Sequence, residues 1–147
     1  MPVNRTVVEA FYRAFASRDP AEIARFIDDD AKWVTVGPID LLQFCGERHG
    51  KKAILDLFQR VGPACLEITS LVPEIMLVDS DRAATLSRLT GRQGATGRII
   101  SYRCAQFLEF RRDKVIDFRS LIDSFDAAEQ MLGHHIDLHV PATAPAL

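Results

Sequence analysis

The sequence lacks the features that define several common classes of protein. Its three cysteines, Cys45, Cys65 and Cys104, are far apart and form no C-x-x-C pair, which argues against a disulfide framework and a zinc ribbon. No apolar run approaches the roughly 20 residues that span a membrane. The first residues also lack the basic and apolar segments of a secretory signal. We therefore expect a cytoplasmic protein with free thiols that does not enter a membrane.

An excess of charge of either sign is also missing. The 147 residues include 18 basic and 20 acidic side chains, which gives a net charge of −2. Nucleic acids and anionic membranes recruit proteins through a concentrated positive field, so neither is an expected partner. Phosphate-binding loops, dinucleotide fingerprints and zinc fingers are absent as well, and we expect no cofactor and no metal site.

The hydrophobic content of the chain is that of one globular domain. Hydrophobic residues make up 48% of it, enough for a domain over residues 1–147 to fold around its own core. In the N-terminal half, apolar residues recur three and four positions apart, as in amphipathic helices. The predicted elements here are helices at 4–17, 20–27 (ended by Asp28–Asp30) and 51–61 (closed by Gly62-Pro63), a strand at 32–36 and an irregular segment at 38–50.

The C-terminal half is rich in β-branched and aromatic residues, in long stretches separated by short turns. Strands are predicted at 66–78, 82–91, 99–110 and 115–122. Such short connections produce an antiparallel meander. Ser124 is expected to cap a last helix at 125–132 that stops at Gly133, and 134–147 has the composition of a tail. Helices followed by strands indicate an α+β fold, and helices packed on a bent sheet enclose a cavity suited to small molecules.

Three segments carry a resemblance to a known family. Phe11-Tyr12-Arg13-Ala14-Phe15-Ala16-Ser17-Arg18-Asp19, running into Ile23–Trp33, resembles the opening of the SnoaL-like, or ketosteroid-isomerase-like, branch of the NTF2-like superfamily. Gly46–Phe58 is similar to its third helix, and Asp113–Asp123 to its last strand. The resemblance implies a cone-shaped barrel of three N-terminal helices on a strongly curved, mostly antiparallel sheet with a short C-terminal helix. It also implies a homodimer formed through the sheet.

The best-known chemistries of that superfamily do not map onto this chain. The ketosteroid-isomerase donor Tyr, base and protonated donor fall on Phe11, Thr35 and Gln106, none of which can act as the carboxylate base that this mechanism needs. The catalytic residues of the limonene-epoxide-hydrolase relatives, a Tyr, an Asn, an Arg and two carboxylates, fall on Trp33, Thr35, Arg88, Thr90 and Ser120. Only the arginine is kept there, and an arginine alone does not activate water. Any enzymatic activity would therefore use other catalytic residues.

The same comparison, combined with the two-residue period of strands, predicts an aromatic chamber with a few polar groups. The expected ligand-pocket residues are Phe11, Phe15, Trp33, Thr35, Phe58, Thr90, Cys104, Gln106, Leu108, Phe118 and Ser120. The candidate catalytic residues are His49, Arg88 and Tyr102. They imply a ligand that is apolar or aromatic and carries a polar or acidic group.

Each candidate also has a purely structural interpretation. Arg88 either points inward and binds an acidic ligand, or it faces solvent or pairs with an acid such as Asp117. His49 is either a general base at the cavity rim or a solvated loop residue. Trp33 either stacks on a ligand or belongs to the core. Cys104 is either a nucleophile or, without a neighbouring histidine, an inert buried thiol.

Two further clusters are weaker candidates. His135 and His139 are four residues apart, the spacing at which a helix can present two metal ligands, but Gly133 is expected to end the helix before them. His134 adjoins them in the expected tail. Asp28–Asp30 is at best a weak cation site.

Three functions remain open on the sequence alone. The chain is a cyclase-, isomerase- or hydrolase-like enzyme acting on a small cyclic or aromatic compound, or a carrier that binds such a compound without turnover. The third alternative is an assembly partner that uses the exposed face of the sheet. Ionisable groups inside the cavity favour an enzyme, whereas aromatic and amide groups favour a carrier.

Overall fold

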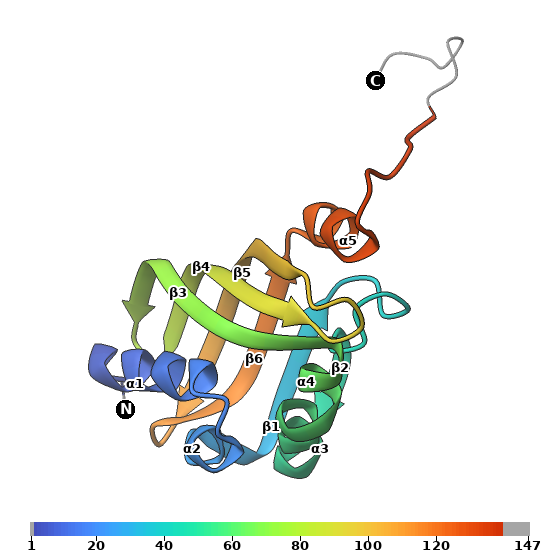
Figure 1. Ribbon diagram of the computed structural model, residues 1–147. Coiled ribbons are helices and arrows are strands. Elements are labelled where there is room, and N and C mark those ends of the chain that lie inside the picture. The colour runs from blue at the N-terminus through green and yellow to red at the C-terminus, as the bar shows by residue number, and fades with distance from the viewer. Residues whose placement is uncertain (1, 140–147) are drawn as a thin grey trace.

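Six strands and the helices packed on them make up the structure, a computed structural model that describes residues 2–139 (Figure 1). The helical elements are α1 (Arg5–Ala16), α2 (Pro20–Ala24), α3 (Lys51–Asp56), the π-helical turn η1 (Leu57–Val61), α4 (Gly62–Cys65) and α5 (Ser124–Leu132). The strands are β1 (Ile27–Val36), β2 (Gly46–His49), β3 (Leu66–Asp79), β4 (Arg82–Gln93), β5 (Ile99–Arg111) and β6 (Lys114–Ile122). Their order in the sheet is β2-β1-β6-β5-β4-β3, and only the β1–β6 pair is parallel. The predicted α+β class and the antiparallel meander of β3 to β6 are confirmed.

The helix start signals in the sequence act as predicted at both N-terminal helices. Asn4 caps α1 by accepting a hydrogen bond from the Thr6 N–H, and Asp19 caps α2 by accepting one from the Ala21 N–H. The last helix ends at Gly133, whose φ of 79° places it in the left-handed conformation that glycine adopts easily. Its N-cap is Asp123 and not Ser124, because the Asp123 carboxylate accepts the Asp126 N–H.

Three predicted boundaries are wrong. Asp28–Asp30 does not end a helix but lies in β1, which begins at Ile27 beside Val115 of β6. The segment predicted to be irregular contains β2, which pairs with β1 in antiparallel register. Finally, Gly62-Pro63 does not end the third helix, because the chain stays helical to Cys65.

The π-helical turn η1 explains why the proline does not stop that helix. The Gly62 N–H bonds to the Leu57 carbonyl five residues earlier, so the turn is wider than in an α-helix. Pro63 then lies in the first turn of α4, where a backbone N–H has no helical partner to lose.

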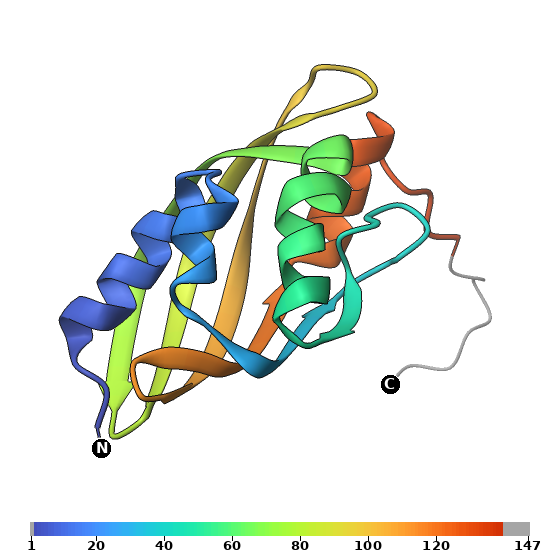
Figure 2. The same ribbon diagram turned by 90° about the horizontal axis from the view of Figure 1, so that it is seen from below.

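The long strands curve around the helices. Irregular pairing interrupts β3 between Ile68 and Ser70 and again between Pro73 and Ile75, and such bulges bend a sheet. In Figure 2, α1, α2 and the α3–α4 segment lie across one face of the curved strands. We call this the inner face and the opposite one the outer face. Between α1 and the inner face lies a core of buried apolar side chains centred on Phe11, whose ring lies within 6.4 Å of six other aromatic rings.

The chain after α5 leads away from the sheet as far as residue 139 (Figure 1). Residues 134–139 have no regular secondary structure, and residues 140–147 of the predicted tail lie outside the described part. Within residues 2–139, no helix combines the length and the apolar character that crossing a bilayer requires.

Candidate functional site

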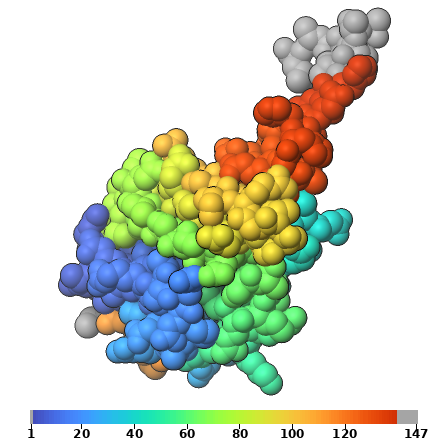
Figure 3. All heavy atoms as spheres, in the orientation of Figure 1, coloured from blue at the N-terminus to red at the C-terminus, as the bar shows by residue number. Residues whose placement is uncertain are grey.

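A chamber of about 460 Å³ lies between the inner face of the sheet and the helices. Its lining comes from the end of α1 and the residues just after it, from η1 and α4, from the loop before β2 and from five of the strands. Cavities of this size, mostly apolar with a few polar groups, are typical small-molecule sites. In Figure 3 the N-terminal helices and the α3–α4 segment meet in one continuous surface.

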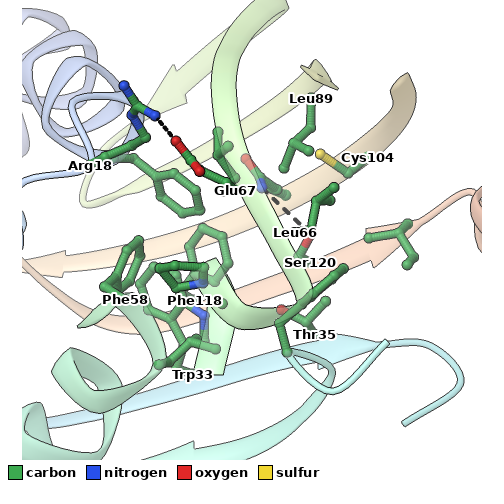
Figure 4. Close-up of a pocket in the computed structure, with 18 of the residues that line it drawn as sticks. Arg18, Trp33, Thr35, Phe58, Leu66, Glu67, Leu89, Cys104, Phe118 and Ser120 are labelled. Carbon is green, nitrogen blue, oxygen red and sulfur yellow. Dashed lines mark hydrogen bonds and ion pairs between the residues drawn. The ribbon is translucent and has the colours of Figure 1, made fainter. Parts of the chain in front are cut away.

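One wall of the chamber is aromatic. The Trp33 and Phe118 rings are stacked, with centroids 3.7 Å apart and planes 13° from parallel. Phe58 meets Trp33 edge-on at 5.5 Å and Phe15 edge-on at 5.0 Å. These four side chains come from α1, β1, η1 and β6, and Figure 4 shows Trp33, Phe58 and Phe118 grouped on one side of the chamber. The wall therefore offers flat apolar surfaces to a ligand.

The opposite wall carries the polar groups, which are the hydroxyls of Thr35, Tyr102 and Ser120, the Cys104 thiol and the Gln106 amide. Alternation along the strands explains why they share the chamber. Tyr102, Cys104 and Gln106 are successive inward residues of β5, and register places Gln106 opposite Ser120 of β6. None of these side chains carries a charge in its protonated form. This wall therefore offers a ligand hydrogen-bond donors and acceptors but no fixed charge.

A buried hydrogen-bond chain fixes the Gln106 amide from behind. The Tyr12 hydroxyl donates to Gln106 Oε1 at 2.8 Å and lies 2.6 Å from Thr85 Oγ1, to which the Ser87 hydroxyl donates at 3.3 Å. The Gln106 Nε2 group then points to Ser120 Oγ at 3.5 Å, the contact drawn as a dashed line in Figure 4. Because these groups are buried and hydrogen-bonded to one another, the amide is held in one orientation.

Burial keeps the ionisable groups of this wall protonated. Desolvation raises the pKa of the Tyr102 phenol well above its ordinary value, and nearby cysteines raise it further. Desolvation also raises the pKa of the Cys104 thiol to about 11, against a smaller opposing effect of its hydrogen bond with Ser120. Cys104 is therefore a thiol at neutral pH, which agrees with its interpretation as inert and not as a nucleophile.

Among the lining residues that the structure describes, the charged side chains lie at the exposed end of the chamber, which we call the mouth. Arg18, at the end of α1, forms an ion pair with Glu67 of β3, and both side chains are about half exposed. Figure 4 shows this pair beside the chamber. Arg18 has a φ of 62°, a left-handed conformation that is uncommon outside glycine, and it forms the joint between α1 and α2.

Most of the residues expected in a pocket lie on the chamber wall. They are Phe15, Trp33, Thr35, Phe58, Cys104, Gln106, Phe118 and Ser120, together with the candidate catalytic residue Tyr102. Phe11 and Leu108 face inward but belong to the core behind the wall. Thr90 lies on the outer face, where its hydroxyl contacts the Ser101 hydroxyl at 3.1 Å.

Arg88 and His49 need the largest corrections. Arg88 does not face the chamber, because the inward residues of β4 are its neighbours Ser87 and Leu89. Its guanidinium lies on the outer face, 3.6 Å from Glu74 and 3.3 Å from the Ser101 hydroxyl. It is thus the solvent-facing, paired arginine of the structural interpretation, with Glu74 in place of Asp117. His49 is exposed at the end of β2 and does not line the chamber.

The two weaker clusters show no metal geometry. Among residues 2–139, no three His, Cys, Asp or Glu side chains converge as metal ligands. His135 contacts Glu129 at 3.0 Å, and Asp28 pairs with Arg111 at 3.1 Å. A hydrogen bond from the Asp30 N–H, assisted by Arg111, lowers the pKa of Asp28 below its ordinary value.

The sequence interpretation missed several residues of the site. Tyr12 and Thr85 were not identified, although Tyr12 follows the inward residue Val8 by one helical turn and Thr85 shares the strand parity of Ser87. Arg18 and Glu67 were missed as well, and no local pattern connects two residues 49 positions apart.

Comparison with known proteins points to one domain family and one fold. Residues 8–118 match the SnoaL-like domain family. A candidate isomerase from Rhodopseudomonas palustris is 34% identical, with a TM-score of 0.75 over 86% of this chain and 93% of its own. At lower identity, only the fold is shared. An LEH-like epoxide hydrolase from M. tuberculosis is 16% identical, with a TM-score of 0.71 over 87% of this chain and 88% of its own.

A protein from Catenulispora acidiphila with a ketosteroid isomerase-like fold, in complex with trimethylamine, is 14% identical. Its TM-score is 0.73 over 90% of this chain and 95% of its own. A comparison with curated protein sequences finds no match.

Proposed function

This chain belongs to the SnoaL-like family, and we propose that it binds a small, mostly apolar, cyclic or aromatic compound in the chamber. The observation that carries the proposal is the chamber itself, about 460 Å³ lined by stacked aromatic rings on one wall and a few neutral polar groups on the other. Aromatic walls favour flat ligands, and the polar groups orient them.

Isomerase chemistry is the second candidate, and the similarity to the R. palustris candidate isomerase favours it. Such chemistry requires a base within reach of the bound compound. Among the described lining residues the one carboxylate is Glu67, which lies at the mouth and is paired with Arg18. Because Glu67 is held in this ion pair at the mouth and not inside the chamber, binding is supported better than proton transfer.

The only tryptophan of the chain provides a direct test of binding. Trp33 lies on the chamber wall, so a ligand that enters should change its fluorescence and raise the melting temperature of the protein. We expect Leu89→Phe, which adds a ring to the chamber, to weaken binding by about tenfold or more. Titration of a panel of aromatic and cyclic compounds, followed by both signals, measures this.

A matched control exists on the same strand. Leu86 lies on the outer face of β4, so Leu86→Phe should leave affinity unchanged. Equal affinity of Leu89→Phe and wild type would mean that ligands bind elsewhere, and the proposal would then be wrong.

We also propose that the partner of this chain is a second copy, docked through the outer face. On this face, the pairing of the strands places one apolar residue from each of five strands side by side. These residues form a row of Ile75, Leu86, Ala105, Leu121 and Val36. Phe107 and Leu77 extend it. Much apolar surface is left in water, because five of these side chains are 45–65% exposed, namely Val36, Ile75, Leu77, Phe107 and Leu121. Contiguous apolar patches of this kind mark interaction sites.

Phe107→Glu is expected to convert this dimer to a monomer, because it places a charge in the centre of an apolar interface. Sedimentation velocity across a concentration series measures the change. Phe125 of α5 is exposed to a similar extent but does not belong to the apolar row of the strands, so Phe125→Glu should sediment like wild type. A wild-type protein that is monomeric at the highest concentration would contradict the proposal.

A further inference from the structure

The two tyrosines of this chain are both buried but differ in one respect. The Tyr12 hydroxyl contacts Thr85 and Gln106, at 2.6 Å and 2.8 Å. The Tyr102 side chain is only 1% exposed, yet its hydroxyl has no hydrogen-bond partner among the described residues. Buried polar groups are nearly always paired, so an unpaired phenol in the interior requires an explanation.

The Tyr102 hydroxyl opens onto the chamber. Within the described part of the chain, no fully enclosed side-chain nitrogen or oxygen lacks a partner. Because Tyr102 lines the chamber and its hydroxyl is unpartnered, the oxygen of that hydroxyl must be the part that reaches the cavity. It is a hydrogen-bonding group for a molecule inside the chamber.

The surroundings decide which kind of molecule this is. Burial keeps the phenol protonated, so it offers an O–H donor to an acceptor on the ligand. Arg18, the cationic side chain in the described lining, lies at the mouth and is paired with Glu67. Arg88 lies on the outer face of the sheet. An anionic acceptor at Tyr102 would therefore be buried without a counter-charge, which is costly. An uncharged oxygen avoids that cost.

We propose that Tyr102 is a specificity residue that donates a hydrogen bond to an uncharged carbonyl oxygen of a cyclic or aromatic ligand. This rests on the proposed binding function and adds the chemical class of the ligand. Because Arg88 lies on the outer face, an acidic group on the ligand would find no partner in it. The hydrogen bond is formed only when a ligand is present, so Tyr102 serves binding and not folding.

A matched series of bicyclic probes tests this proposal. The series consists of α-tetralone, which carries a carbonyl, tetralin, which has no polar group, and α-aminotetralin, which carries a cation near neutral pH. Trp33 fluorescence and melting temperature report binding of each. The wild-type protein is expected to bind α-tetralone about tenfold more tightly than tetralin, and α-aminotetralin least.

Tyr102→Phe should remove this preference, so that α-tetralone and tetralin bind equally. Thr90→Val is the control, because it removes a hydroxyl on the outer face, away from the chamber, and should keep the preference for the ketone. The preference is a ratio of two affinities in the same variant, so a general loss of stability does not imitate the expected result.

The outcomes separate the two proposals. Equal wild-type affinities for α-tetralone and tetralin, or a preference retained in Tyr102→Phe, would overturn the role of Tyr102 and leave the binding function standing. No response to any member of the series would count against the binding of bicyclic compounds in this chamber, and so against both proposals.

Discussion

Phe118→Ala is expected to lower the free energy of unfolding by about 3–5 kcal/mol, the usual cost of removing a buried aromatic ring. Phe118 is 1% exposed on β6, between β1 and β5, where its loss affects both neighbouring strands. Its ring stacks on Trp33 at 3.7 Å and lies about 6 Å from Phe11 and Phe15. The substitution leaves a void that joins the chamber, and the surrounding strands cannot collapse to fill it.

Urea unfolding measured by circular dichroism gives the change in stability. Phe125→Ala is the matched control, because Phe125 is 46% exposed on α5 and should cost less than about 1 kcal/mol. Folded Phe118→Ala should also show a red-shifted Trp33 emission, since water reaches the indole. Similar unfolding free energies for the two variants would mean that the aromatic wall adds little to the core.

Tyr12→Phe is expected to lower the free energy of unfolding by about 1–3 kcal/mol, because it leaves Gln106 Oε1 and the Thr85 hydroxyl without their shortest hydrogen bond while both remain buried. Tyr102→Phe also removes a phenolic hydroxyl, and Tyr102 is buried like Tyr12. Its hydroxyl has no partner among the described residues, so the stability should stay within about 0.5 kcal/mol of wild type or rise.

The pair therefore separates a structural hydroxyl from a functional one. Thermal and urea denaturation of both variants without ligand provide the measurement. A strong destabilisation by Tyr102→Phe would show that its hydroxyl already has a partner, such as an ordered water, in the free protein. The order of the two variants, with Tyr12→Phe the less stable, is the decisive result.

Much of the fold follows from local pattern. Asn4 and Asp19 cap helices because their side chains accept backbone N–H groups two residues ahead, an interaction contained within one turn. The four long strands follow from β-branched stretches and short turns. Pro63 shows the limit of this approach, since a single wide turn before it lets the helix continue, and no sequence rule for proline anticipates that turn.

The site could be predicted only in part. Alternation correctly groups Tyr102, Cys104 and Gln106, because residues two apart always share a face of a strand. It does not say which face is the inner one, and a choice wrong by one residue placed Arg88 in the chamber in place of Leu89. The pairing of Arg18 with Glu67 depends on how α1 meets β3, a tertiary contact that periodicity does not contain.

The parallel pairing of β1 with β6 has a consequence for the order in which the protein is made. Lys32 pairs with Asp117 and Thr35 with Ser120, so β1 acquires this neighbour only after β6 has left the ribosome. Contacts between residues so far apart in sequence slow folding, because a long loop must close first. Until then, Trp33 and its aromatic neighbours are exposed on an incomplete chain, where chaperones can bind them. The residues proposed to hold a ligand are thus among the last to become buried.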